Sequence, residues 1–127
     1  MNEFFGHEKL RVYQEALKFI EWVEKNTKKV PKTIAAKKHL DEASTSIVLN
    51  IAEGNGRYSN KDKCKFFDIS KGSSLECAGC IDVLKAKGFE LEEKSGKNIL
   101  KNIFSMLIGL IKATSKNRIY EDSAEYN

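Results

Sequence analysis

The sequence predicts an all-α protein, an antiparallel up-down-up-down four-helix bundle, and three observations lead to that fold class. Apolar residues recur at three- and four-residue steps through four segments of about twenty residues. The chain holds a single proline, and no segment keeps the two-residue alternation typical of a strand. The links between the segments are short, as in bundles of antiparallel helices. A chain of 127 residues has the size of one domain, which we assign to residues 1–127.

The first two helices are expected over residues 8–27 and 33–55. Pro31 lies in the segment between them and disfavours one continuous helix. Gly54 and Gly56 end the second helix, since glycine is common at helix C-termini. The apolar stripes consist of Leu10, Tyr13, Leu17 and Ile20 in the first helix, and of Ile34, Leu40, Ala43, Ile47 and Ile51 in the second.

The third and fourth helices are expected over residues 60–87 and 90–116. Ser59 or Asn60 offers an N-cap side chain to the third helix, and Gly88 stops it. The inner face of this helix has small residues at its centre, including Ser70 and Ser74. Residues 118–127 carry a net charge of −2 and are expected to form a flexible acidic tail.

Positive charge is concentrated in two clusters. The chain has a net charge of +4 and a pI near 8.9, a balance that suits a polyanionic partner without requiring one. In an antiparallel bundle the two clusters belong to opposite ends. Solvated surface and contacts to nucleic-acid phosphates both fit them. The first cluster is Lys25, Lys28, Lys29, Lys32, Lys37 and Lys38, and the second is Arg57, Lys61, Lys63 and Lys65.

The sequence favours a cytoplasmic protein with no membrane partner. No apolar run reaches the roughly 18–20 residues that a membrane span needs. The N-terminal stretch MNEFFGHEKL lacks the basic and apolar regions of a signal peptide. Three cysteines are an odd number, which is simplest to reconcile with reduced thiols.

The short motifs that resemble zinc, redox or di-iron sites lack the further ligands or the helix position that such sites need. Cys77 and Cys80 form a Cys-x-x-Cys motif in the middle of a helix, without the second ligand pair of a zinc site and away from the helix N-terminus that lowers a thiol pKa. Neither His7 nor His39 follows a Glu by three residues, as di-iron bundles require. We therefore predict no catalytic, metal or cofactor site and no small-molecule substrate.

A more specific signal lies between Ser46 and Leu84. Its motifs are Asn50-Ile51-Ala52-Glu53-Gly54, Gly56-Arg57, Gly72-Ser73 and Glu76, and the first helix opens with Leu10-Arg11-Val12-Tyr13-Gln14. With these motifs, residues 8–115 resemble a bacterial family of four-helix-bundle proteins encoded in intervening sequences of 23S ribosomal RNA genes. That family usually has proline where this chain has Val48, so the second helix is expected to be straighter here.

The resemblance implies a cytoplasmic homo-oligomer, a pentamer in members of the family, with no established enzymatic activity. Distant relatives of similar fold bind a reverse transcriptase and nucleic acid as accessory proteins of retroelements. The resemblance therefore suggests two kinds of partner, further copies of the chain and RNA or another nucleic acid.

Asn50 and Glu53 are polar residues in an otherwise apolar helical stretch. We hypothesise a buried polar patch between the second and third helices, in which Gly72 permits close approach, Asn50, Ser73 and Glu76 exchange hydrogen bonds, and Glu53 reaches Arg57 or the start of the third helix. A ligand or catalytic pocket formed by Asn50, Glu53, Arg57 and Glu76 is the alternative. The hypothesised patch consists of Asn50, Glu53, Arg57, Gly72, Ser73 and Glu76.

Three classes of function follow from these observations. The main prediction is a non-enzymatic, oligomeric bundle protein, and the alternative is a nucleic-acid-binding accessory protein; an enzyme would need a metal or small molecule that the sequence does not suggest. The aromatic residues exceed what a narrow core needs, so some are expected to face neighbouring subunits, unless they fill a wide core. These residues are Phe19, Trp22, Phe66, Phe67 and Phe104.

Overall fold

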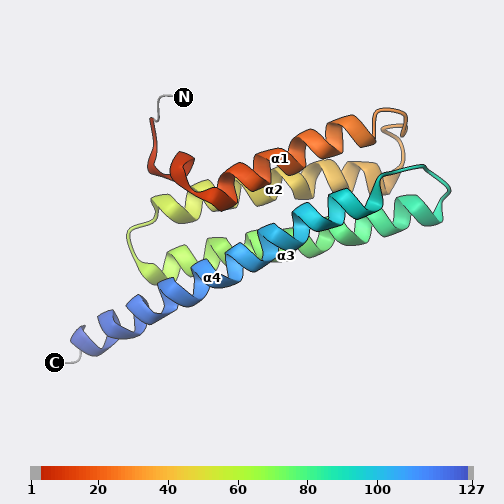
Figure 1. The fold of residues 1–127 in the computed structure, drawn as a ribbon. Helices are drawn as coiled ribbons and strands as arrows, with labels where there is room; N and C mark the ends of the chain where they lie inside the picture. Colours follow the sequence, from red (N-terminus) through yellow and green to blue (C-terminus); the bar gives the residue numbers. More distant parts are fainter. Residues whose placement is uncertain (1–3, 126–127) are drawn as a thin grey trace.

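The computed structural model describes the backbone of residues 4–125 and the side chains through residue 115, and over that range its regular structure is entirely helical. A short 3-10 helix, η1 (Gly6–Lys9), precedes α1 (Arg11–Asn26), α2 (Ala35–Gly56), α3 (Asn60–Ala86) and α4 (Glu93–Glu125) (Figure 1). The predicted all-α fold with four helices is confirmed.

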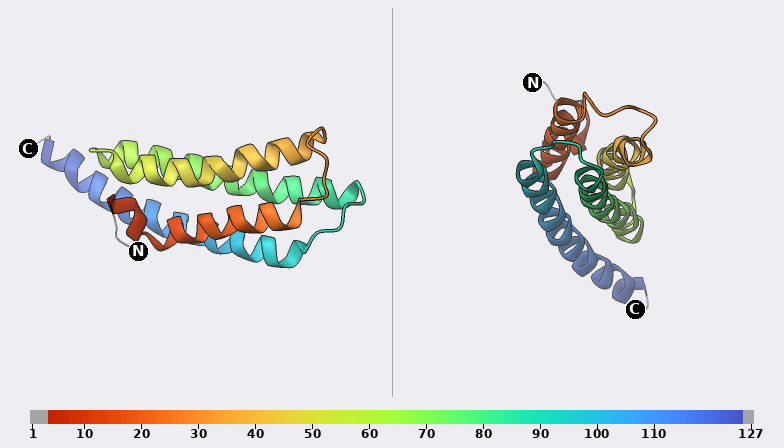
Figure 2. Two further views of the ribbon diagram at one scale, coloured as in Figure 1. Left: turned by 90° about the horizontal axis from the view of Figure 1, so that it is seen from above. Right: turned by 90° about the vertical axis from the view of Figure 1, so that its right-hand side faces the viewer.

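Each long helix packs against two others, because α1 and α3 both contact α2 and α4. Side-chain contacts join opposite ends of neighbouring helices, which makes those neighbours antiparallel. Thr27, just after α1, contacts Lys37 near the start of α2, and Trp22 near the end of α1 contacts Ser95 near the start of α4. The α1–α4 face therefore lies on the opposite side of the bundle from the α2–α3 face (Figure 2).

The helix boundaries differ from the expectation chiefly at two points, the start of the first helix and the end of the fourth. The first predicted helix is divided, because Glu8 accepts the backbone N–H groups of Phe4 (2.6 Å) and Phe5 and closes η1 as a separate turn, after which Leu10 is extended. The predicted end near residue 116 is wrong, since α4 continues to Glu125 through most of the stretch expected as a flexible tail. Residues 110–125 contain neither glycine nor proline to interrupt it. Residues 126–127 lie outside the described range.

The end of α3 is fixed by a Schellman motif. Gly88 adopts φ +93°, a left-handed conformation that favours glycine. The N–H of Gly88 donates to the carbonyl oxygen of Lys85 at 3.0 Å, and the N–H of Phe89 donates to that of Leu84 at 3.1 Å. This motif sets the position at which Phe89 leaves the helix.

The core is one continuous cluster of aliphatic and aromatic side chains between the four helices. Phe19, Trp22 and Phe67 are buried in it and so fill the core, which is the alternative considered for the aromatic residues. Phe66 and Phe104 are only half-buried. Within the described residues, no helix combines the length and the apolar character needed to cross a membrane.

Candidate functional site

The outer line of contact between α2 and α3, here called the α2–α3 seam, contains most of the hypothesised polar patch. Its register is set by two hydrogen bonds between the helices. The hydroxyl of Ser70 donates to the carbonyl oxygen of Ile47 at 2.9 Å, and the hydroxyl of Ser73 donates to that of Ser46 at 2.9 Å. Small side chains at these positions let the helices approach closely enough for direct bonds.

Asn50 takes part in this seam through Ser46. Its side-chain amide donates to the carbonyl oxygen of Ser46 at 2.9 Å and to the Ser46 hydroxyl at 3.0 Å. Since Ser73 donates to the same hydroxyl, Ser46 connects Asn50 with Ser73. Ser46 was not among the predicted patch residues, although it lies four residues before Asn50 and so on the same helical face.

The charged members of the patch lie elsewhere on the seam and are exposed. Glu53 pairs with Arg57 one helical turn later, and the Arg57 guanidinium lies 4.5 Å from the centre of the Phe66 ring, a cation–π contact. Glu76 lies 3.9 Å from Nδ1 of His39. The hypothesis of one buried network is therefore wrong: the structure forms three separate clusters, because long carboxylate and guanidinium side chains at the edge of the seam reach water at little cost.

Close approach of the two helices depends on Gly54, not on Gly72. A Cβ atom on residue 54 would lie 2.8 Å from Cε1 of Phe67 and 3.1 Å from Cβ of Phe66. Gly72 is exposed, and a Cβ atom there would have no neighbour within 4 Å. The role predicted for Gly72 is thus wrong, since that residue occupies the outer face of α3.

The outer face of the seam is apolar between its polar clusters. Ile69, Gly72, Gly79 and Val83 lie on one helical line of α3, on which the exposed Glu76 stands between Gly72 and Gly79, and Leu49 lies on α2 three residues after Ser46. Leu49 is 61% exposed, Val83 44% and Ile69 41%. These residues form a surface that the described chain leaves uncovered.

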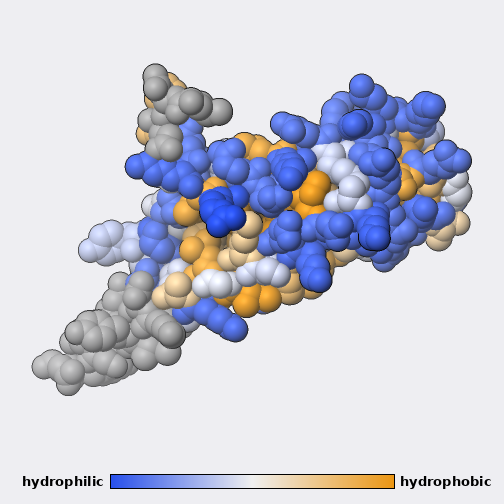
Figure 3. All heavy atoms as spheres, in the orientation of Figure 1, coloured by the Kyte–Doolittle hydropathy of each residue, from blue (hydrophilic) through white to orange (hydrophobic). Residues whose placement is uncertain are grey.

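A second apolar surface lies on the opposite side, between α1 and α4. Figure 3 shows hydrophobic residues uncovered among hydrophilic ones on this face. A groove of about 530 Å³, here called the α1–α4 groove, is lined by Lys9, Leu10, Arg11, Val12, Met106, Gly109, Leu110 and Ala113.

The two basic clusters lie at opposite ends of the bundle (Figure 1). The first surrounds the α1–α2 link and the second surrounds the α2–α3 turn. Lys63 of the second cluster donates to the carbonyl oxygen of Asn55 at 2.9 Å and so helps to close the end of α2. Arg57 is held by Glu53 and Phe66, while Lys61 and Lys65 are exposed.

Lys37 was expected as a possible phosphate contact of the first cluster, and this expectation is wrong. Its side chain is buried, and Nζ donates to the hydroxyl of Thr27 at 2.8 Å and to Asp41 at 2.7 Å. A buried ammonium with two partners joins α1 to α2 and is not available to a phosphate. The other five lysines of this cluster are exposed.

Sequence reasoning missed a pocket at the same end of the bundle. It has a volume of about 480 Å³, lies between the α1–α2 and α3–α4 links, and is here called the link pocket. In the sequence, the glycine of Lys87-Gly88-Phe89 indicates that α3 ends there and that an aromatic side chain follows directly. Only the fold shows that Phe89 lines a pocket together with the lysines after α1. The pocket is lined by Lys25, Asn26, Lys28, Lys29, Val30, Gly88, Phe89 and Glu90.

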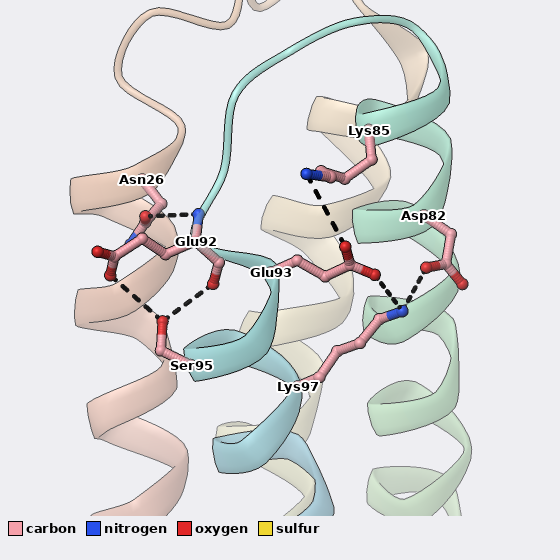
Figure 4. A network of polar contacts seen from close by, with 7 residues as sticks. All are labelled: Asn26, Asp82, Lys85, Glu92, Glu93, Ser95 and Lys97. Atoms are coloured by element: carbon pink, nitrogen blue, oxygen red, sulfur yellow. Dashed lines mark hydrogen bonds and ion pairs between the residues drawn. The ribbon is translucent and has the colours of Figure 1, made fainter.

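Polar contacts beside this pocket hold the start of α4 in place (Figure 4). The backbone N–H of Glu92 donates to the side-chain oxygen of Asn26 at 3.4 Å. The Ser95 hydroxyl donates to the carbonyl oxygen of Glu92 at 2.9 Å and accepts the indole N–H of Trp22 at 2.9 Å. The end of α1 is therefore connected to the start of α4 through side chains.

Two carboxylates on the α3 and α4 side of this end, those of Asp82 and Glu93, are paired with lysines. Lys97 donates to Asp82 and, at 2.7 Å, to Glu93, and Lys85 lies 3.9 Å from the other oxygen of Glu93 (Figure 4). The hydrogen bond to Asp82, followed by that to Glu93, raises the pKa of Lys97. Asp82 and Glu93 are consequently engaged with these lysines, and within the described side chains Lys25, Lys28 and Lys29 form no ion pair.

Cys77 and Cys80 are buried in the core. Burial, with a smaller effect from Cys80, raises the pKa of the Cys77 thiol, and burial, followed by Glu76, raises that of Cys80. Both thiols are thereby held in the protonated, unreactive form, which suits a packing role.

Comparison with known proteins identifies the family. A family model for the 23S rRNA-intervening sequence protein matches residues 8–109. A comparison with curated proteins finds no match. Among solved structures, the fold is similar to that of a protein of unknown function from the S23 ribosomal protein family of Bacteroides thetaiotaomicron, with a TM-score of 0.72 and 23% identity over 80% of this chain and 98% of that chain. The structural likeness shows a shared fold, and the family match covers most of the sequence: the chain belongs to the 23S rRNA-intervening sequence protein family.

Proposed function

We propose that this chain is a non-enzymatic protein that assembles with copies of itself into a closed ring, a pentamer by the family resemblance. The observation that supports assembly is the pair of apolar surfaces, the α2–α3 seam and the α1–α4 groove, on opposite sides of the bundle. Exposed apolar patches with polar surroundings are typical of protein interfaces. Contact between two different surfaces of successive subunits gives a ring when the rotation closes.

The polar groups favour binding over catalysis. Glu53 and Glu76, the carboxylates of the alternative catalytic pocket, are exposed and belong to separate clusters. Acid–base catalysis instead needs groups that converge on one reacting atom. The three cysteines are free thiols, which agrees with the reducing cytoplasm that we propose as the location.

The proposed ring is tested by single charges placed in each surface. Gly72 and Gly109 are exposed, and a side chain at either would meet no atom within 4 Å, so Gly72→Lys and Gly109→Lys should fold normally. Light scattering behind size exclusion should show a ring for the parent chain and for Thr33→Lys, an exposed control in the α1–α2 link. Each of the two glycine variants should fall to smaller species.

Mixing the two variants distinguishes a ring from a symmetric dimer. In a ring, the intact groove of Gly72→Lys still fits the intact seam of Gly109→Lys, so the mixture should form heterodimers that cannot close. A contact of one surface with its own copy would give no such heterodimer. A monomeric parent chain, or a ring unaffected by both variants, would contradict the proposal.

A second proposed function is RNA binding, supported by the exposed lysines of the first basic cluster. No ion pair within the described side chains involves Lys25, Lys28 or Lys29. Lysines that lack carboxylate partners attract phosphates, with an affinity that falls as salt rises. Purification with and without nuclease, followed by absorbance at nucleic-acid and protein wavelengths, tests whether RNA accompanies the chain and leaves it in high salt.

A further inference from the structure

We infer that the link pocket is a binding site for single-stranded nucleic acid, in which one base stacks on Phe89 and the neighbouring phosphates contact Lys25, Lys28 and Lys29. This inference rests on the RNA binding proposed above and names its site. The pocket volume of about 480 Å³ lies within the roughly 300–1,000 Å³ of ligand pockets.

The aromatic wall of the pocket is held in place before any ligand binds. The Schellman motif at Gly88 fixes the backbone of Phe89. The Phe89 ring packs on the core with part of its surface and lines the pocket with the rest. An aromatic ring fixed at the edge of a pocket is what base stacking needs, because every base presents a flat face to it.

The cationic wall is also anchored. Val30 is buried, and its N–H donates to the carbonyl oxygen of Thr27 at 3.0 Å. The hydroxyl oxygen of Thr27 in turn accepts a hydrogen bond from the buried ammonium of Lys37. The backbone that carries Lys28 and Lys29 is thus held on both sides, while their side chains are exposed toward solvent and the pocket.

The charge of the pocket favours an anion, and one residue opposes it. Three lysines line the pocket against Glu90 as the one acidic residue of its lining. Glu90 is exposed, and removal of its charge should strengthen phosphate binding by reducing repulsion. Removal of the Glu90 charge should tighten binding, whereas removal of a lysine charge should weaken it. A variant of Glu90 therefore tests the site more specifically than a variant of a further lysine.

The experiment is fluorescence anisotropy with labelled oligouridine, with a DNA strand of the same length and with duplex RNA, each over a range of salt concentrations. Phe89→Leu keeps an apolar side chain on the core and removes the stacking ring. It should weaken single-strand binding about fivefold or more. Phe104→Leu, a half-buried phenylalanine on α4 outside the pocket, is the matched control. Glu90→Gln should tighten binding.

The lysines are tested by the salt dependence. Lys28→Gln with Lys29→Gln should lower the slope of log affinity against log salt by about 1.4, since each single-strand phosphate contact contributes about 0.7. Lys61→Gln with Lys65→Gln is the control at the opposite end of the bundle. Binding of either single strand in preference to the duplex supports the site, and the tighter strand identifies the sugar that the ligand carries.

The outcomes separate the two claims. If the parent chain binds no nucleic acid, the proposed RNA function fails and the site fails with it. If the parent binds, but only the Lys61 and Lys65 variant weakens binding, the link pocket is overturned while RNA binding stands. Duplex RNA that binds as tightly as the single strand would also overturn the site, because paired bases cannot stack on Phe89.

Discussion

Gly54 of α2 lies directly against the Phe67 ring of α3, so closely that a Cβ atom on residue 54 would lie 2.8 Å from Cε1 and 2.9 Å from Cδ1. Phe67 is 2% exposed, so its ring cannot turn out into solvent without leaving the core. The absence of a side chain at residue 54 is therefore a condition for the packing of α2 on α3.

We predict that Gly54→Ala destabilises the protein. Alanine in a helix is favoured over glycine by about 1 kcal/mol, but overpacking against a buried ring costs roughly 1–3 kcal/mol, and the clash should dominate. Urea unfolding at one fixed protein concentration measures the difference. Gly56→Ala is the control, because its Cβ would meet nothing within 4 Å and it lies in neither proposed subunit interface. A Gly54→Ala protein as stable as the Gly56→Ala protein would contradict the prediction, because it would show that α2 and α3 accommodate the added methyl group without loss of stability.

Gly96 of α4 has the same relationship to Trp22 of α1. A Cβ atom on residue 96 would lie 2.6 Å from Cε2 of the indole, whose N–H is bonded to Ser95. Gly96→Ala should displace the indole from its buried site and lower the free energy of unfolding by roughly 1–3 kcal/mol. Trp22 is the one tryptophan in the chain, so its fluorescence emission should shift to longer wavelength. An unchanged emission spectrum would contradict the prediction.

Lys37 should not contribute to nucleic-acid binding. Its ammonium is directed to Thr27 and Asp41 and is buried, so Lys37→Met should leave the affinity for oligouridine and its salt dependence unchanged. Lys38 is the neighbouring, exposed lysine, and Lys38→Met is the matched comparison. A reduced salt slope in Lys37→Met would mean that this side chain leaves its partners and reaches the ligand.

The stability should fall at alkaline pH through Cys77. Burial raises the pKa of this thiol in the folded state, whereas in the unfolded chain a cysteine titrates near 8.5. Above that pH the unfolded state loses a proton that the folded state keeps, so the free energy of unfolding falls with pH by up to about 1.4 kcal/mol per pH unit.

Urea unfolding between pH 7.5 and about 9.5, where most lysine and tyrosine side chains still keep their protons, measures the effect of Cys77. Cys77→Ala should lose stability at every pH from the cavity but show a shallower decline than the parent chain. Equal slopes in the two proteins would show that the Cys77 thiol does not carry this pH dependence.

Local sequence determined the helices and their order. The apolar period, Pro31 and the glycines after α2 and α3 specify four helices because helical spacing and chain breaks depend on residues close together in the chain. Short links then favour antiparallel neighbours, which places the two basic clusters at opposite ends. The motifs around Asn50 and Glu76 also indicate the family, to which the match over residues 8–109 assigns the chain.

The tertiary structure decided which side chains of each helix are inside. Gly54 of α2 and Gly72 of α3 are both glycines near the α2–α3 seam, and only the rotation of the two helices about their axes makes the first a close contact and the second an exposed position. Lys37 and Lys38 are adjacent lysines, and only the position of Thr27 buries the first. Phe89 and Lys28 are about sixty residues apart in the chain and share one pocket. Helix rotation and register depend on the packing of side chains that are distant in the sequence. This packing is the sum of many small contacts, which cannot be predicted from a local pattern of residues.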